Sequence, residues 1–371
     1  MIWLGLIIVF FRSNVFAFDY PYTIRSPEAL VMGDAYTAVN ADEFTMFYNP
    51  ATLARHKKDF SFYPFNPQLN GTNLLNDAQR FKEFQDGQID ASEVLMDYPV
   101  HASAGIAPGF KLFNVGVSFF ATESYDLLLR NSSHPMLDID LHSDKGIIIG
   151  TGIPIGKSRL NRQSQSGSQT SLGVSFKYLE RTGVRETIAL LSPEVAEALS
   201  EDGVKDIIDS IDRVKSVGHG FDAGIEHVVR KGSSQFVLGL SALDIGGIEF
   251  KESSHPENIQ VSDIRDQVNL GIAVGQNFNF FHYILSADVR GLNEETDFGK
   301  RLRLGAQIGI PGLKLMGGIN SGYYSLGATL DLFFLKLTTG LYGLELGTNY
   351  QQIKSSRFVV YLSLFDFSFD A

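Results

Sequence analysis

Asp138, Asp140, His142 and Asp144 alternate along one stretch of the chain and could together bind a metal ion. In an extended strand their side chains share one face, because successive side chains point to opposite faces. Ca²⁺ prefers such carboxylate oxygens, but no turn glycine completes a binding loop here. A solvated outer hairpin explains the same pattern without a metal. We therefore expect no metal and no other cofactor.

Nucleophilic catalysis is the second kind of chemistry to consider. A lipase or protease needs a Ser/His or Asp/His set that the fold brings together. The chain has 8 His and many Ser and Asp residues, so the fold could bring such a set together from distant parts of the sequence. It contains no Gly-x-Ser-x-Gly, no phosphate-binding loop and no His-Glu-x-x-His. Cysteine is absent, which removes thiol catalysis, disulfides and thiolate metal sites. We expect that the chain is not an enzyme.

The composition excludes several classes of protein. Hydrophobic residues make up 44% of the 371 residues and charged residues 20%, unlike a disordered chain or a helical membrane bundle. The net charge of −11 disfavours a nucleic-acid partner, since phosphate binding requires a basic surface. The chain has 36 Gly, 29 Phe and 14 Tyr. Glycine and aromatic residues in alternating runs are typical of a membrane β-barrel wall.

The N-terminus has the pattern of a secretory signal. Ile2 to Phe11 is apolar but far shorter than the roughly 20 residues that span a bilayer. Val15-Phe16-Ala17 fits a cleavage site, so residues 1–17 are predicted to be a signal peptide. No Lys or Arg precedes the apolar run, and Arg12 follows it, which departs from the usual pattern. No later apolar run is long enough for a transmembrane helix.

Beyond residue 57 the chain divides into about fourteen alternating segments, an even number that suits a bacterial barrel with both ends in the periplasm. The last segment places Phe365, Phe367 and Phe369 on one face and Asp366, Ser368 and Asp370 on the other. We predict an all-β transmembrane fold, an antiparallel outer-membrane β-barrel of about 14 strands, over residues 58–371. The predicted strands are 58–65, 98–107, 110–122, 145–155, 169–180, 217–229, 234–245, 266–276, 279–290, 301–310, 312–319, 323–332, 334–345 and 356–369.

The connections differ in length between the two ends of the predicted barrel. Short turns are expected at Pro108-Gly109, 230–233, Asn277-Phe278, Pro311 and Phe333. Long connections are expected at 66–97, 123–144, 181–216 and 246–265. Short turns on one side and long loops on the other are typical of outer-membrane barrels, whose long loops face outward.

Charged residues on the polar face of the strands are predicted to point into the lumen. They carry both signs, which indicates a salt-bridged interior rather than an ion-selective conduit, although both interpretations stay open. The predicted lumen-facing charges are Lys177, Asp222, Glu226, Asp288, Arg301 and Arg303.

A helical outer loop is predicted near 192–215, beginning with Ser192-Pro193-Glu194. Its apolar positions form one stripe of an amphipathic helix. The stripe either packs over the barrel rim or contacts a hydrophobic ligand or a partner protein. Its members include Leu199, Val204, Ile207, Ile208 and Ile211.

The segment 18–57 is too short to form its own core, so it is predicted to be a plug inside the barrel. The run Leu30 to Val39, with Asp42 and Asn49-Pro50-Ala51, resembles the N-terminal hatch of the FadL-like outer-membrane superfamily, closest to its PorV-like and uncharacterised groups. Thr52 stands where that motif usually has Gly, and the chain ends in Ala371 rather than an aromatic residue. The hatch-motif positions are Gly33, Ala35, Asp42, Asn49, Pro50 and Ala51.

The resemblance implies two possible functions. The first is passage of hydrophobic small molecules, fatty-acid-like or aromatic, across the bacterial outer membrane, with a sideways exit into the lipid. The second is a PorV-like barrel that transports nothing and anchors or receives secreted or surface proteins. The expected partners are outer-membrane lipid, the barrel-assembly machinery and either a hydrophobic ligand or a protein.

Overall fold

The computed structural model gives the conformation of most of the chain. The described residues are 22–39, 42–55, 59–74, 82–83, 86, 96–131, 133–156, 166–190, 213–252, 261–332 and 334–369. The predicted signal peptide, the stripe from Leu199 to Ile211 and both predicted domain boundaries, near 17 and 57, lie outside these residues. Those three features stay predictions.

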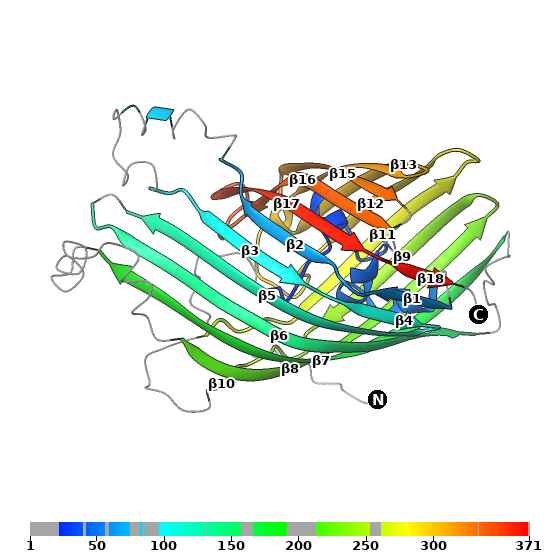
Figure 1. Ribbon diagram of the computed structural model, residues 1–371, viewed down its shortest axis with the longest axis horizontal. Coiled ribbons are helices and arrows are strands. Elements are labelled where there is room, and N and C mark those ends of the chain that lie inside the picture. The colour runs from blue at the N-terminus through cyan, green and yellow to red at the C-terminus, as the bar shows by residue number, and fades with distance from the viewer. Residues whose placement is uncertain are drawn as a thin grey trace, which may run out of the picture.

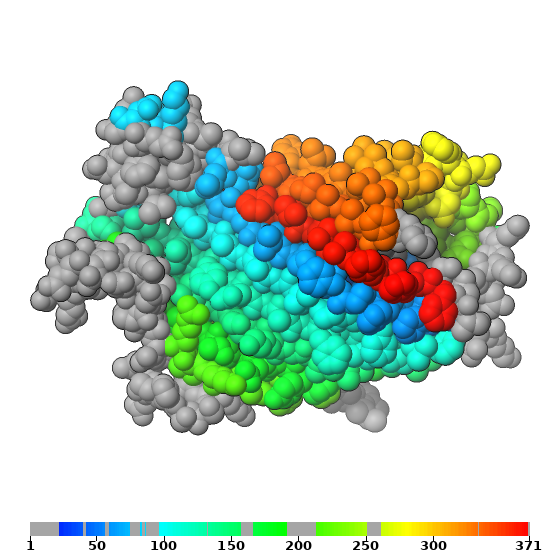
Figure 2. All heavy atoms as spheres, in the orientation of Figure 1, coloured from blue at the N-terminus to red at the C-terminus, as the bar shows by residue number. Residues whose placement is uncertain are grey.

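The chain forms a closed 14-strand antiparallel β-barrel (Figure 1). Three of the wall strands are divided into two pieces each: β1 with β2, β3 with β4, and β17 with β18. The last strand closes the barrel on the first, since β17 pairs with β2 and β18 with β1. In Figure 2 the red C-terminal strand accordingly lies beside the blue first strand.

The wall strands have the following bounds. They are β1 Phe60–Tyr63, β2 Pro67–Thr72, β3 Val100–Ile106, β4 Gly109–Leu112, β5 Val115–Arg130, β6 Met136–Ile155, β7 Ser166–Ala189, β8 Val214–Lys231, β9 Ser234–Leu243, β11 Gln267–Asn277, β12 His282–Val289, β13 Leu302–Ile310, β14 Leu313–Asn320, β15 Tyr323–Leu332, β16 Leu335–Glu345, β17 Lys354–Leu364 and β18 Phe367–Phe369. A short additional strand, β10 (Lys251–Glu252), pairs with β8.

The wall has an apolar outer surface because its strands alternate. In β7, Leu172, Val174 and Phe176 are exposed, whereas Ser171 and Ser175 between and beside them are buried. The same alternation places aliphatic side chains on the outside of β8, β9, β11 and β13. No described helix is both long enough and apolar enough to cross a membrane.

Exposed aromatic side chains border this apolar surface at both rims. Such girdles are typical of strands that cross a bilayer. At the rim with short turns they are Phe113, Phe278, Phe280, Phe281, Phe334 and Phe365. At the rim with longer loops they are Phe298, Tyr324 and Tyr350.

The difference in loop length between the rims is present, but two predicted connections are wrong. The chain does not turn at Pro108-Gly109, because β3 and β4 are one divided wall strand and both pair with β5. It turns instead at Phe113, whose φ of 51° supplies the left-handed conformation of a tight turn. The segment 66–97 also contains a strand, since β2 covers Pro67–Thr72.

The predicted long loop 123–144 is wrong as well. Residues Val115–Arg130 and Met136–Ile155 form one hairpin, whose pairing runs without a register change from Val115↔Thr151 to Arg130↔Met136. β7 follows the same extension and pairs with β6 as far as Ala189. The charged residues in this stretch indicated a loop, but strands that rise above a membrane can carry them on both faces. Strands β5, β6 and β7 therefore project further than their neighbours (Figure 1).

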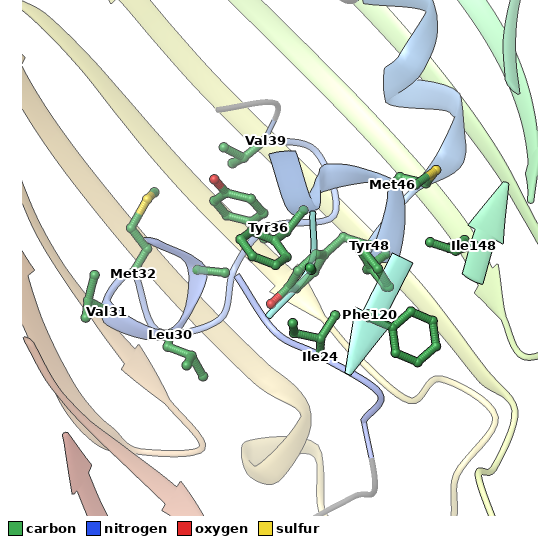
Figure 3. Close-up of a cluster of buried hydrophobic side chains, with 14 of the residues drawn as sticks. Ile24, Leu30, Val31, Met32, Tyr36, Val39, Met46, Tyr48, Phe120 and Ile148 are labelled. Atoms are coloured by element: carbon green, nitrogen blue, oxygen red, sulfur yellow. The ribbon is translucent and has the colours of Figure 1, made fainter. Parts of the chain in front are cut away.

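The described residues 22–39 and 42–55, which we call the hatch, lie inside the barrel. They form helix α1 (Pro27–Val31), the 3-10 helices η1 (Glu43–Phe47) and η2 (Pro50–Arg55), and the turns between them. Ser26 caps α1 through a hydrogen bond from the Ala29 N–H, and Pro27 begins it. The hatch side chains Leu30, Met32, Tyr36 and Met46 are fully buried, and Figure 3 shows them with Phe120 and Ile148 of the wall.

The hatch contacts the wall at glycines, where the two backbones approach closely. A Cβ atom on Gly173 of β7 would overlap the backbone of Pro50 and Ala51. A Cβ atom on Gly318 of β14 would overlap the backbone between Met32 and Gly33. The high glycine content of the chain thus serves docking of the hatch as well as packing within the wall.

Replacing Gly173 by Ala should displace η2 from the wall, because the new methyl group has no space. Overpacking of this kind costs about 1–3 kcal/mol. We expect a lower thermal unfolding midpoint in detergent and faster proteolysis within residues 42–55. Gly317→Ala is the matched control, since its Cβ would lie 3.6 Å from the nearest atom, an ordinary contact. Equal behaviour of the two variants would contradict close docking at Gly173.

Candidate functional site

Ion pairs connect the hatch to the barrel wall from several sides. Arg55 forms two hydrogen bonds of 2.6 Å with Glu226 of β8. Lys314 of β14 contacts Glu28 at 2.7 Å, and Lys336 of β16 contacts both Glu28 and Glu43, at 3.3 and 3.2 Å. Such pairs are specific but breakable, because the free energy of desolvation offsets most of the attraction.

Asp34 and Arg290, the residue that follows β12, form another of these pairs, with both side chains almost fully buried. Burial alone would raise the pKa of Asp34, but the Arg290 guanidinium holds it below its ordinary value. Asp34 therefore stays charged in the lumen. The hydroxyl of Tyr48 also donates to this carboxylate.

Asn49 links two parts of the hatch to the wall. Its side-chain amide donates to the carbonyl oxygens of Thr37 and, at 3.4 Å, of Ile225 in β8. Its Oδ1 accepts the N–H of Ala51, which starts η2 together with Pro50. The hydroxyl of Thr52, at the position where the resembling motif has Gly, donates to the Asn49 carbonyl. Asn49-Pro50-Ala51 therefore fixes the geometry of the hatch.

The other hatch-motif residues are also buried. Gly33 has a φ of 66° and lies against β13 and β14, and Ala35 is fully enclosed. Asp42 caps η1 by accepting the N–H of Phe44, and it also accepts from the hydroxyl of Ser26. Burial, and after it the negative charge of Glu43, raises the pKa of Asp42 to about 6.

The six predicted lumen charges have different surroundings. Asp288 accepts the N–H groups of Tyr36 and Thr37 at 2.8 Å, so it and Glu226 both hold the hatch. Lys177 pairs with Asp222 and Asp244 within the wall. Arg303 donates to Ser321. Arg301 lies in helix α6 (Phe298–Arg301), before β13, and donates to Thr296.

The four alternating residues near 140 are occupied by protein partners. Asp144 binds Arg181 through both oxygens, and Asp138 binds Arg130. Asp140 accepts from Ser262 and contacts His142. No group of three or more potential metal ligands occurs among the described residues.

A cavity of about 110 Å³ lies between the start of the hatch and the strands β2, β3 and β5. Its lining is mixed, with Ile24 and Leu30 of the hatch beside polar side chains of the wall. Two of those polar residues, Ser103 and Asp126, are each hydrogen-bonded to a third, His101. The alternation His-x-Ser in a predicted strand was the available sequence signal for His101 and Ser103. Asp126 was missed because it falls in the stretch predicted as a loop.

The wall beside this cavity contains an interruption. β1 and β4 pair in one register, Phe60↔Leu112, whereas β2 and β3 pair in a register shifted by one residue, Pro67↔Ile106. Between them the side chain of the fully buried Asn66 replaces the missing backbone partner. Its amide donates to the Ala107 carbonyl and accepts the Ala107 N–H, both at 2.8 Å. The bulge is therefore closed by one side chain.

Comparisons with known proteins give similarity of architecture only. No protein-family model and no curated protein sequence matches the chain. The CymD monoaromatic hydrocarbon channel resembles it at 9% identity and a TM-score of 0.49, over 95% of this chain and 100% of that one. The toluene transporter TbuX of Ralstonia pickettii matches at 9% identity and 0.46, over 94% and 99%. The toluene transporter TodX of P. putida matches at 11% and 0.41, over 95% and 100%.

The raised pKa of Asp42 predicts a pH dependence of hatch stability. The folded chain binds the proton more tightly than the unfolded chain, whose Asp has a pKa near 3.8. Stability from this group is fully present below that value and is lost as pH rises through about 6. We expect the unfolding midpoint in detergent to be higher at about pH 5 than at about pH 7.5.

Asp42→Asn should remove this part of the dependence, since the amide does not titrate in this range. The comparison is the difference between the midpoints at the two pH values, wild type against variant. An unchanged difference in the variant would show that Asp42 ionises normally in the fold.

Proposed function

We propose that the chain is an outer-membrane barrel that passes small hydrophobic molecules and is closed at rest by the hatch. The apolar belt and the aromatic girdles at both rims support the membrane location, since a charged side chain facing lipid at the midplane costs about 2–4 kcal/mol. In this orientation the longer loops face outward and the short turns face the periplasm. The predicted signal peptide and assembly by the barrel-assembly machinery belong to the same proposal.

The observation that carries the proposal is the way the hatch is held. Separate ion pairs with β8, β14, β16 and Arg290, the residue after β12, fix it, and no disulfide exists, because the chain lacks cysteine. Each pair can exchange its partner for water, so the hatch can shift without unfolding the barrel. A permanently sealed barrel would be better filled by apolar side chains, because buried charge pairs are often less stabilising than hydrophobic packing.

The interruption at Asn66 supports a sideways exit for the cargo. It lies on the strands that line the cavity, since Gln68, two residues along, is one of the lining side chains. At the bulge itself, two side-chain hydrogen bonds, each worth about 0.5–1.5 kcal/mol net, take the place of backbone pairing. Apolar cargo gains about 0.8 kcal/mol per CH₂ on leaving water for lipid. A route from the cavity through this part of the wall is therefore downhill for such molecules.

One observation favours the alternative, a PorV-like barrel that anchors or receives secreted or surface proteins. The described hatch contacts the wall backbone closely at Gly173 and Gly318, which leaves no passage at those two points. A filled lumen suits a protein that acts through its outer loops. The predicted stripe from Leu199 to Ile211 would then be a partner-binding surface.

Uptake into liposomes separates the two functions. Glu226→Gln should loosen the hatch by removing its ion pair with Arg55, and uptake of small aromatic molecules should rise several-fold over the wild type. Glu180→Gln is the matched control, since its pair with Lys215 is exposed and does not involve the hatch. If neither the wild type nor Glu226→Gln admits any solute, the barrel is a plug and the anchoring function stands.

Asn66→Ala should increase leakage through the wall beside the cavity. We expect faster transfer of an apolar dye from the lumen into the bilayer, with no change for glucose, because only the sideways route is affected. Fluorescence of a membrane-sensitive dye in reconstituted vesicles reports this transfer. Equal acceleration for both solutes would mean that the variant opens an aqueous pore instead.

A further inference from the structure

His101, Ser103 and Asp126 form a connected set on the lumen face of the wall. His101 and Ser103 are two residues apart in β3, so both side chains point inward. Asp126 lies directly opposite His101 on the neighbouring strand β5. The distances are 2.8 Å from His101 Nδ1 to Asp126 Oδ1 and 3.1 Å from His101 Nε2 to Ser103 Oγ.

The contacts determine where the protons lie. A carboxylate accepts hydrogen bonds, so the nitrogen facing Asp126, Nδ1, carries the imidazole proton. Nε2 is then the basic nitrogen, and it accepts the hydroxyl proton of Ser103. This is the arrangement of a nucleophile, a general base and an orienting carboxylate, which is recognised by geometry and not by sequence order.

Neighbouring side chains hold each member in place. Asp126 also accepts from Ser124 and from Arg357 of β17, both at 3.1 Å, which fixes its carboxylate toward the imidazole. The Asn70 amide donates to Ser103 Oγ at 3.1 Å. The opposite oxygen of Asn70 accepts from Gln68 at 3.3 Å, so the N–H side of the amide faces the serine. This hydrogen bond orients the hydroxyl oxygen of Ser103 within the cavity.

The set opens into the cavity. His101, Ser103, Asn70 and Asp126 all line it, and Ser103 is only partly buried. The volume of about 110 Å³ compares with about 150 Å³ for a cavity that holds benzene. Leu30 and Ile24 supply an apolar side for a short hydrocarbon group. The site therefore fits an ester of a short-chain acid rather than a long lipid chain.

We propose that Ser103 is the nucleophile of an ester-hydrolysing site in the lumen, with His101 as its base and Asp126 as a positioning residue. Ser103 Oγ attacks the ester carbonyl carbon while its proton passes to His101 Nε2. The intermediate expels the alcohol, which takes that proton, and an acyl-serine remains. Water then attacks the acyl-serine, with His101 accepting its proton and returning it to Ser103. The products are a carboxylic acid and an alcohol.

This activity goes beyond passage of molecules through the barrel. The same contacts would also be present if the three residues only bound neighbouring strands together. A purely structural set would not make Ser103 reactive toward an electrophile. Reactivity that depends on His101 is therefore the property to measure.

The experiment uses the full-length barrel in mild detergent with diisopropyl fluorophosphate, a small reagent that forms a covalent bond with activated serines. Mass spectrometry of the intact chain and of its peptides locates the adduct. We expect one adduct at Ser103, none in Ser103→Ala, and labelling slowed about 100-fold or more in His101→Gln, since general-base catalysis contributes about 10²–10⁴-fold. Turnover is measured separately with p-nitrophenyl acetate.

Ser325→Ala is the matched control, because this buried serine of β15 lies outside the site. If His101→Gln does not fold, as judged by gel mobility without heating, Asp126→Asn replaces it and should also slow labelling. No adduct at Ser103, or equal labelling rates in the wild type and these variants, would overturn the proposal. Either result would leave the uptake experiment unaffected, since that depends on the hatch.

Discussion

The interior of this barrel depends on one constraint: a segment rich in polar backbone must be buried against a wall of strands. The hatch has only short helices, so many of its N–H and C=O groups find partners outside regular structure. The wall supplies a partner through Asp288, which accepts two successive N–H groups, and the hatch side chain Asn49 donates to the carbonyl oxygens of Thr37 and of Ile225 in β8. Unpaired groups of this kind would cost about 1–3 kcal/mol each. These contacts therefore favour the position of the hatch that the structure shows.

Ion pairs and close backbone contacts together determine the position of the hatch. Glycines such as Gly173 let the two backbones approach, and the approach brings Arg55 to Glu226 and Asp34 to Arg290. Removing one partner of a buried pair costs about 3–5 kcal/mol, because the other charge is left without compensation. The ion pairs consequently determine where the hatch sits more than they stabilise the barrel. The hatch can be released by a molecule that competes for these ion pairs, which is the physical basis of the proposed gate.

The sequence predicted the barrel well because alternation is imposed by the membrane. Asp222, Glu226 and Asp288 were placed on the polar face of their strands from the alternation alone, and their side chains are buried. The prediction of strands and turns from the sequence failed where the alternation of apolar and polar residues carries no information. Pro108-Gly109 has the composition of a turn yet lies within a divided strand, since the register shift at Asn66 is a property of two paired wall strands and not of one. Strands β5 to β7 rise beyond the apolar belt, where charged residues no longer distinguish a strand from a loop. The contact between His101 and Asp126 depends on that extension, so no local pattern could reveal it.

The cavity connects these features. It is bounded by the hatch on one side and by the bulged wall on the other, so a molecule held there faces both possible ways out. On the proposed sideways route a neutral ester would leave, because lipid favours its hydrocarbon part. The carboxylate formed by hydrolysis cannot, since an isolated charge is strongly disfavoured in an apolar medium. A nucleophilic serine at this point would therefore determine the exit route. An intact ester would pass into the membrane, whereas the acid formed by cleavage would be confined to the aqueous route past the hatch. The same cavity would then serve both ester hydrolysis and the passage of molecules.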